Sequence, residues 1–201
     1  MHISDGILSG PVLISGAGLT VAGTALGLKK LDYDKLPETA VLASVFFVAS
    51  LIHVKIGPTS MHLVLSGVCG LLLGWVAFPA ILVGLTLQAV LFQHGGLTTL
   101  GVNTFNMAFP AVIVGFFCRG ALRSDNPMKR WIAEFLCGAC SILFSAILVA
   151  LSLILTGRAF IAPAEVALAA HVVVMIVEGI LTIFIVEFLR KARPEMLQPS
   201  A

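Results

Sequence analysis

Five histidines and the first residues of the chain form the pattern best suited to chemistry. The histidines are His2, His53, His62, His94 and His171, and imidazole is the commonest protein ligand for metal ions. Because His2 follows Met1, a free Met1 amine, the His2 backbone nitrogen and the His2 imidazole can chelate one ion in a plane. One further imidazole would complete four nitrogens, a set that favours Ni(II) or Cu(II) and that low-spin Co(II) also accepts.

The same residues allow a simpler interpretation, because a Met-His start arises by chance and a single histidine often only makes hydrogen bonds. Two features favour the chelate. The first ten residues lack the basic segment of a cleavable signal peptide. Initiator methionine is normally removed only before small residues, so we expect Met1 to remain next to the large His2.

The composition indicates what kind of protein must position these groups. Of the 201 residues, 59% are hydrophobic and 11% are charged, against about 45–50% and about 25% in a soluble domain. The mean hydropathy is +1.07. These values predict an all-α integral membrane protein. Seven spans of about 20 residues would leave about 60 residues, too few for a separate soluble catalytic domain.

Apolar runs divided by charges, glycines and prolines predict a single transmembrane domain over residues 1–201. The expected spans cover residues 11–28, 37–54, 60–76, 79–94, 98–118, 131–156 and 165–189. Residues 1–10 form an N-terminal segment and residues 194–201 a flexible tail. The stretch 60–94 is one long apolar run, and we divide it at Trp75–Pro79.

The positions of the few charges test that division independently. Ten of the twelve basic residues fall in three clusters: Lys29, Lys30 and Lys35; Arg119, Arg123, Lys129 and Arg130; Arg190, Lys191 and Arg193. Basic loops stay in the cytoplasm, so an even number of spans must separate consecutive clusters. Four spans and then two meet this condition only if residues 60–94 are divided. The N-terminus is then outside, the C-terminus is cytoplasmic, and all five histidines lie toward the outer half.

Glu178 is the acidic residue nearest the middle of a predicted span. A carboxylate inside a membrane is costly and points to function. His171, Met175 and Glu178 follow one another at i, i+4 and i+7, so they share one helical face. Two interpretations remain open: a transient relay for metal or protons, and a buried structural glutamate.

Three motifs resemble the CbiM/NikM family, the metal-specific membrane components of cobalt and nickel energy-coupling-factor (ECF) transporters. Residues 1–6, Met-His-Ile-Ser-Asp-Gly, resemble that family's Met-His-Ile-Pro-Asp-Gly start, with Ser4 in place of the usual proline. The second motif is Gly57-Pro58-Thr59-Ser60-Met61-His62-Leu63. The third runs from Trp75–Pro79 through Gln88, Phe92, Gln93 and Gly95–Gly101 to Asn103. The resemblance covers most of residues 1–119.

The resemblance implies a ligand set and its surroundings. The N-terminal segment would fold into an outer cavity, where the Met1 amine, the backbone nitrogen and imidazole of His2, and the His62 imidazole hold the metal. Ser60, Asn103 and Asn106 are candidates for hydrogen bonds that orient the ligands, and for Asn103 a helix–helix hydrogen bond is the alternative. Asp5 and Gly6 form a turn signal, and Asp5 would hold the N-terminal turn rather than bind metal. His94 is a candidate for the outer mouth, and His171 and Glu178 are candidates for metal transit.

The resemblance also implies a function. The chain would be the substrate-binding subunit of an ECF-type ABC transporter in the bacterial cytoplasmic membrane, capturing Co(II), or alternatively Ni(II), for cobalamin synthesis. It implies a CbiQ-like coupling protein, a CbiO-like ATPase and a small CbiN-like membrane subunit. The chain lacks the G-x-x-x-x-G-K-[ST] motif, so ATP hydrolysis is expected in the ATPase. We expect no organic cofactor and no nucleic-acid partner.

Two other classes compete with this interpretation. An intramembrane metalloenzyme could use His53, His62, His94 or Glu178, but the chain has no H-E-x-x-H motif. A passive ion channel must release its ions easily, whereas a site with four nitrogens binds too tightly for conduction. We therefore expect a transport subunit and not an enzyme.

Overall fold

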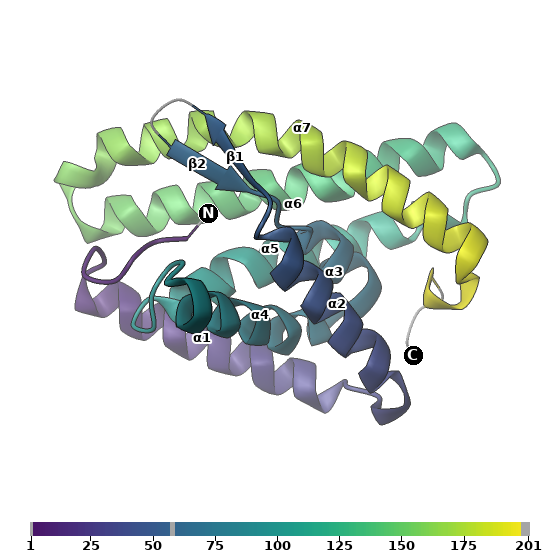
Figure 1. Cartoon of the computed structure of the whole chain (residues 1–201), viewed down its shortest axis with the longest axis horizontal. Coiled ribbons are helices and arrows are strands. Elements are labelled where there is room, and N and C mark those ends of the chain that lie inside the picture. The colour runs from purple at the N-terminus through teal and green to yellow at the C-terminus, as the bar shows by residue number, and fades with distance from the viewer. Residues whose placement is uncertain (1, 57–58, 198–201) are drawn as a thin grey trace.

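The computed structural model describes residues 2–56 and 59–197, without the side chains of residues 53–61, as a helical bundle with one short hairpin (Figure 1). The α-helices are α1 (Gly10–Lys29), α2 (Leu36–Ala49), α3 (Ser66–Leu73), α4 (Ala77–Phe92), α5 (Leu100–Arg119), α6 (Pro127–Thr156) and α7 (Ile161–Ala192). Strands β1 (His53–Ile56) and β2 (Thr59–His62) pair antiparallel, with His53 opposite His62. Short 3-10 turns lie at Tyr33–Lys35, Gly74–Val76, Ala121–Arg123, Arg158–Phe160 and Pro194–Leu197.

Several helices begin where the sequence carries an N-terminal signal. α1, α2 and α6 each have a proline in their first turn, where the missing N–H is not needed. The Asn126 side chain caps α6 by accepting a hydrogen bond from Met128 N at 2.9 Å. These signals explain why α6 starts at Pro127, four residues before the predicted span.

Five helical segments among the described residues are long and apolar enough to cross a membrane. They are Gly10–Lys29, Ser66–Phe92, Leu100–Arg123, Pro127–Thr156 and Arg158–Ala192. The all-helical membrane class therefore agrees with the prediction, whereas the count of seven spans is not reproduced by this criterion.

Two of the seven predicted spans are not long helices. α2 has 14 residues and ends at Ala49. The helix expected from residue 60 starts only at Ser66, because β2 and three residues without regular secondary structure occupy residues 59–65. The dipeptide Gly57-Pro58 disfavours a helix at this point of the sequence.

The chain turns back on itself between α3 and α4. Arg119 Nε, at the end of α5, donates a hydrogen bond to Leu71 O at 2.8 Å, so the end of α3 lies beside the end of α5. Gly74 then adopts a φ of +57°, a conformation that glycine reaches without a steric penalty. The far end of α4 leads to His94, whose ring lies near His2. The turn at Gly74–Val76 adjoins the predicted division at Trp75–Pro79.

The bundle has two chemically different ends. The three basic clusters meet at one of them: Lys30 and Arg119 line one cavity of about 360 Å³, and Arg130 and Arg190 both pair with Glu187. α6 starts at this end and runs for 30 residues, or about 45 Å.

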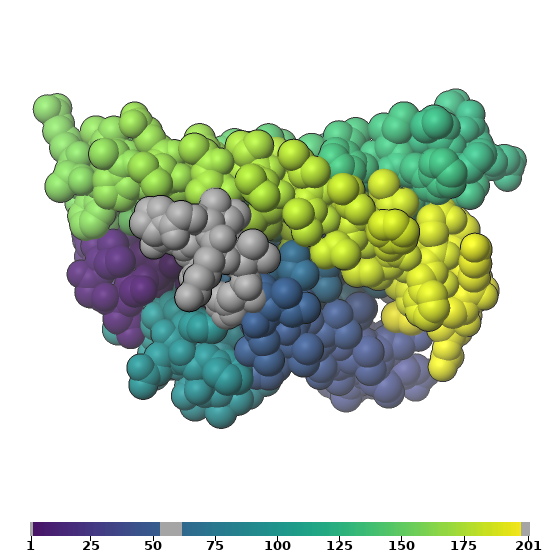
Figure 2. All heavy atoms as spheres, turned by 45° about the horizontal axis from the view of Figure 1, so that its top comes forward, coloured from purple at the N-terminus to yellow at the C-terminus, as the bar shows by residue number. Residues whose placement is uncertain are grey.

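The N-terminal segment lies at the opposite end of α6. Ser9 N donates a hydrogen bond to Thr156 Oγ1 at 3.3 Å, which ties the segment to the last residue of that helix. α7 returns along α6 to the basic end, and Figure 2 shows it lying across one face of the molecule. The histidine-bearing segment and the basic clusters are therefore separated by the length of the bundle.

Close helix packing holds α1 and α3 in place. A Cβ atom at Gly16 or Gly23 of α1 would collide with Val102 or Phe78, and one at Gly70 of α3 would collide with the Ala111 backbone. Small residues allow such close approach between membrane helices. α3, which follows His62, is thus fixed inside the bundle.

Candidate metal centre

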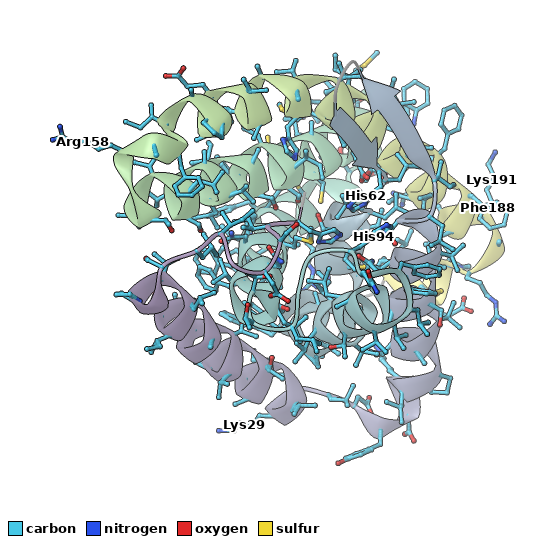
Figure 3. All side chains as sticks on the ribbon, turned by 60° about the vertical axis from the view of Figure 1, so that its left-hand side comes forward. Lys29, His62, His94, Arg158, Phe188 and Lys191 are labelled. Atoms are coloured by element: carbon cyan, nitrogen blue, oxygen red, sulfur yellow. The ribbon has the colours of Figure 1, made fainter. Side chains whose placement is uncertain are left out.

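Three imidazoles from separate parts of the chain gather at the end that holds the N-terminal segment. The ring centroids of His2 and His62 are 4.7 Å apart and the rings are nearly parallel, at 15°. The His94 ring lies 6.5 Å from that of His2, at 18°. Figure 3 shows His62 and His94 close together in the interior, beside the N-terminal segment. The structure thus brings the predicted ligands His2 and His62 and the predicted mouth residue His94 into one cluster.

Asn103 on α5 anchors the backbone that follows His2. Ile3 N donates to Asn103 Oδ1 and Asn103 Nδ2 donates to Ile3 O, both at 3.0 Å. The Thr99 hydroxyl also donates to Ile3 O, at 2.8 Å. Ile3, Thr99 and Asn103 are all buried. Asn103 therefore orients His2 through the adjacent peptide groups.

Asp5 holds the same segment to the loop between α4 and α5. Its carboxylate accepts hydrogen bonds from Leu97 N at 3.2 Å, from Thr98 N at 3.0 Å and from the Thr98 hydroxyl. The hydrogen bond from the Thr98 hydroxyl is the largest cause that lowers the pKa of Asp5. These hydrogen bonds of Asp5 thus go to a distant loop, whereas the sequence predicted bonds within its own turn.

Two glycines make room for this docked segment. Gly95 has a φ of +78°, and a Cβ atom there would lie 3.3 Å from His2 Cβ and 3.2 Å from Asn103 Nδ2. A Cβ atom at Gly96 would collide with the Asp5 carboxylate. The Gly95-Gly96 pair therefore leaves room for His2 and Asp5, and glycine also suits the backbone conformation at the first position.

His62 has a defined orientation. Its Nδ1 lies 2.9 Å from Leu63 O. Because a carbonyl oxygen can only accept, this hydrogen bond requires the proton on Nδ1 and leaves the lone pair on Nε2. Neutral imidazole with one nitrogen held by a backbone carbonyl is the usual form of a metal-binding histidine.

His2 is in an environment that also favours the neutral, metal-binding form. Burial lowers the pKa of His2 well below its usual range, and His62 and His94 act in the same direction. The fully buried Gln88 side chain opposes this effect. Metal ligands must be deprotonated, so the His2 imidazole needs to release little proton to bind an ion.

Two residues beside the cluster were not assigned to it from the sequence. Gln88 lies next to His2, and Thr99 holds Ile3 O. Both are fully buried polar side chains. A polar residue inside an apolar run was the available signal, but it does not distinguish a site residue from a helix–helix hydrogen bond.

Asn106 and His171 have partners elsewhere. Asn106 Nδ2 donates to Ser152 Oγ at 3.2 Å and so links α5 to α6. His171 Nδ1 forms a hydrogen bond with Ala167 O within α7.

Glu178 binds the backbone of residues that closely follow His62. The Glu178 carboxylate accepts hydrogen bonds from the backbone nitrogens of Val64 and Leu65. Met1 and the side chain of Ser60 lie outside the described residues, and their predicted roles stay predictions.

The side chains of the cluster do not make a complete metal site by themselves. Among the described residues, no group of three His, Cys, Asp or Glu side chains could hold a metal ion. The chelate expected from the sequence adds main-chain nitrogens to the imidazoles, and it stays a prediction because Met1 lies outside the described residues.

The long apolar helices are those of a multi-pass membrane protein, and the partly buried histidine cluster is of a kind that suits a metal ion. Residues 2–196 match the family model CbiM, described as the cobalt uptake substrate-specific transmembrane region. The chain therefore belongs to the CbiM family of metal-transport membrane proteins.

Individual relatives agree with this assignment. The chain is 39% identical to a putative metal transport protein of Haemophilus influenzae, over 98% of this chain and 97% of the relative. It is 28% identical to the cobalt transport protein CbiM of Sorangium cellulosum, over 98% and 94%. It is 31% identical to the putative fused nickel transport protein NikMN of Archaeoglobus fulgidus, over 100% and 69%.

A solved structure has the same fold. The crystal structure of a transition metal transporter superposes on this chain with a TM-score of 0.75 at 27% identity, covering 96% of this chain and 93% of that chain. A truncated transition metal transporter gives a TM-score of 0.76 at the same identity, covering 96% and 99%.

Proposed function

We propose that this chain is the substrate-binding subunit of an ECF-type ABC transporter and captures Co(II) on the outer side of the bacterial cytoplasmic membrane. Ni(II) is the alternative substrate. The ion is held by the Met1 amine, the backbone nitrogen and imidazole of His2, and the His62 imidazole. The relatives include proteins named as cobalt transporters and as nickel transporters, so the choice of ion rests on the resemblance of the motifs.

The approach of the His2 ring to within 4.7 Å of the His62 ring carries this proposal. Two imidazoles that bind one ion in adjacent positions, through nitrogens at about 2.0–2.1 Å, lie about this close. The approach is not accidental, because Asn103, Thr99 and Asp5 all hold the N-terminal segment in place. Asn103 and Thr99 bind Ile3, and Asp5 binds the loop between α4 and α5, so the anchored positions lie immediately after His2.

The distribution of charge supports the proposed orientation. The basic clusters lie together at the end of the bundle away from the histidines. Basic residues remain on the cytoplasmic side, so the histidine cluster faces outward and the C-terminus lies inside. An ion captured there must cross the membrane after leaving a strong chelate, which requires work.

ATP hydrolysis in separate subunits supplies that work in our proposal. The partners are a CbiQ-like coupling protein and a CbiO-like ATPase, together with a small CbiN-like membrane subunit. The fused NikMN relatives, by their names, join an M-like and an N-like part in one chain, which favours an N-like partner here. The delivered cobalt would serve cobalamin synthesis.

Metal titration of two histidine variants tests the assignment of the ligands. We expect His62→Ala to weaken Co(II) and Ni(II) binding strongly, because it removes one of four nitrogens. His94→Ala is the matched control, since it removes a neighbouring ring that is 6.5 Å from His2, and we expect a mild effect. The reverse order would identify His94 as the fourth ligand. Competition between the two ions on the unmodified protein decides which is the substrate.

A further inference from the structure

A single peptide group connects Glu178 on α7 to His62. This peptide joins Leu63 to Val64. Its carbonyl oxygen accepts the hydrogen bond from His62 Nδ1 at 2.9 Å, and its N–H donates to Glu178 Oε1. Because a peptide group is planar and rigid, the two hydrogen bonds hold the Leu63–Val64 peptide group from opposite sides.

Glu178 also holds the next residue. Leu65 N lies 3.0 Å from Glu178 Oε1 and 2.9 Å from Oε2. Leu65 has a φ of +55°, a conformation that leucine rarely adopts and that persists only when its surroundings hold it. Glu178 is fully buried and comes from a helix more than 100 residues away. Its recorded partners are the two backbone nitrogens that follow the His62–Leu63 pair.

The negative charge of the Glu178 carboxylate lies near the positive end of the α3 helix dipole. Val64 and Leu65 immediately precede α3, whose first residue is Ser66, and the N-terminus of a helix carries a partial positive charge. In the part of the chain that the structure describes, no Lys, Arg or His forms an ion pair with Glu178. The backbone N–H groups are therefore the partners that stabilise this carboxylate inside the bundle.

We propose that Glu178 is a positioning residue for metal binding. It holds the Leu63–Val64 peptide so that its carbonyl fixes the proton of His62 on Nδ1 and directs the Nε2 lone pair at the metal. Hydrogen bonds in a chain polarise one another in a low-dielectric interior, so Glu178 also makes the Leu63 carbonyl a stronger acceptor and His62 a more basic ligand. This role rests on the proposed function, in which His62 binds the ion.

This role differs from a transit ligand for the metal. A relay would need carboxylate oxygens that are exposed to the path of the ion. Here both oxygens accept backbone N–H groups, and an ion could take their place only by breaking the turn that positions His62. Glu178 thus acts on the metal through His62.

A double-mutant cycle on Ni(II) affinity tests the proposal in the full chain with its natural N-terminus. Glu178→Gln keeps the size of the side chain but replaces one acceptor oxygen with a donor that faces backbone N–H. We expect Ni(II) affinity to fall about 10- to 100-fold, the usual effect of removing a group that orients a metal-binding histidine. In a His62→Ala background, the same substitution should cost nothing further.

The outcomes separate this proposal from the proposed function. If His62→Ala does not affect binding, the ligand set is wrong. If His62→Ala weakens binding but Glu178→Gln does not, or if the two losses simply add, only the role of Glu178 is wrong. Glu134→Gln is the matched control, because Glu134 is equally buried but lies at the basic end and pairs with Arg190. Its Ni(II) affinity should stay within about twofold of the unmodified protein.

A second measurement needs no variant at position 178 and covers the case in which Glu178→Gln fails to fold. Nitrogen-15 NMR of histidine-labelled, metal-free protein reports which ring nitrogen carries the proton, and comparison with His62→Ala assigns the signal. We expect His62 to be protonated on Nδ1 alone. A proton on Nε2, or a mixture of the two forms, would overturn the proposal.

Discussion

Replacement of Asn103 by alanine should weaken metal binding without removing a ligand. Asn103 makes two hydrogen bonds to Ile3, one to its N–H and one to its carbonyl, each at 3.0 Å. In Asn103→Ala the carbonyl keeps the Thr99 hydroxyl as a donor, whereas Ile3 N loses its acceptor, the Asn103 side-chain oxygen. Ile3 is 4% exposed, so water cannot readily replace that partner.

The expected loss of metal affinity follows from the unpaired Ile3 N–H. A buried donor without an acceptor costs about 1–3 kcal/mol, and each 1.4 kcal/mol corresponds to a tenfold change in affinity. This cost falls on the docked state of the N-terminal segment, which is the state that presents His2 to His62. If docking and binding are coupled, Co(II) or Ni(II) affinity should therefore fall about 5- to 150-fold.

The assay is competition for Ni(II) against a coloured chelator, on purified protein with its natural N-terminus. Asn106→Ala is the matched control, because Asn106 lies one turn further along α5 and bonds to Ser152 instead of the N-terminal segment. Hydrogen exchange at Ile3 should also become faster in Asn103→Ala. Unchanged affinity in Asn103→Ala, or an equal loss in both variants, would refute the view that docking of residues 2–5 presents the ligands.

Two further substitutions test the surroundings of the site. Gly95→Ala places a Cβ atom 3.3 Å from His2 Cβ at a residue whose φ is +78°. The conformational cost of about 1–2 kcal/mol should lower Ni(II) affinity about 5- to 30-fold. Gly18→Ala is the control, because a Cβ atom there meets no neighbouring atom, and it should leave the affinity unchanged. Normal affinity in Gly95→Ala would mean that the loop adapts. Arg119→Leu removes the donor to Leu71 O and Gly70 O at the end of α3 and should destabilise the protein by about 1–3 kcal/mol. Thermal unfolding in detergent, with the exposed Arg123→Leu as control, checks this, and equal midpoints would contradict it.

The long helices were accessible to prediction because they combine long apolar runs with local start signals. α5, α6 and α7 cover residues 100–119, 127–156 and 161–192, against predicted spans of 98–118, 131–156 and 165–189. The strands at residues 53–62 and the eight-residue α3 were not predicted. A short buried helix has no local pattern that reveals it when the N–H groups just before it, those of Val64 and Leu65, are bound by a distant carboxylate.

The site was accessible to prediction only in part, for a similar reason. The pairing of His2 with His62 follows from motifs that resemble a family, whereas the partners of Asn103, Thr99 and Asp5 depend on contacts across more than 90 residues. A side chain that binds a distant backbone group leaves no trace in the spacing of residues. Asn103 was therefore predicted to act near the ligands, but its actual partner, the Ile3 peptide, could not be inferred.

Blocking the chain's first amine tests the central claim most directly. Two proteins are compared by Co(II) and Ni(II) titration, one with residues added ahead of Met1 and one with the natural N-terminus and a C-terminal tag. The His2–His62 approach supplies two imidazoles, so the proposed site depends on the amine and the adjacent backbone nitrogen for its strength. We predict tight binding of one ion per chain to the C-terminally tagged protein and loss of that binding in the extended one. Equal stoichiometry and affinity in both would contradict the account.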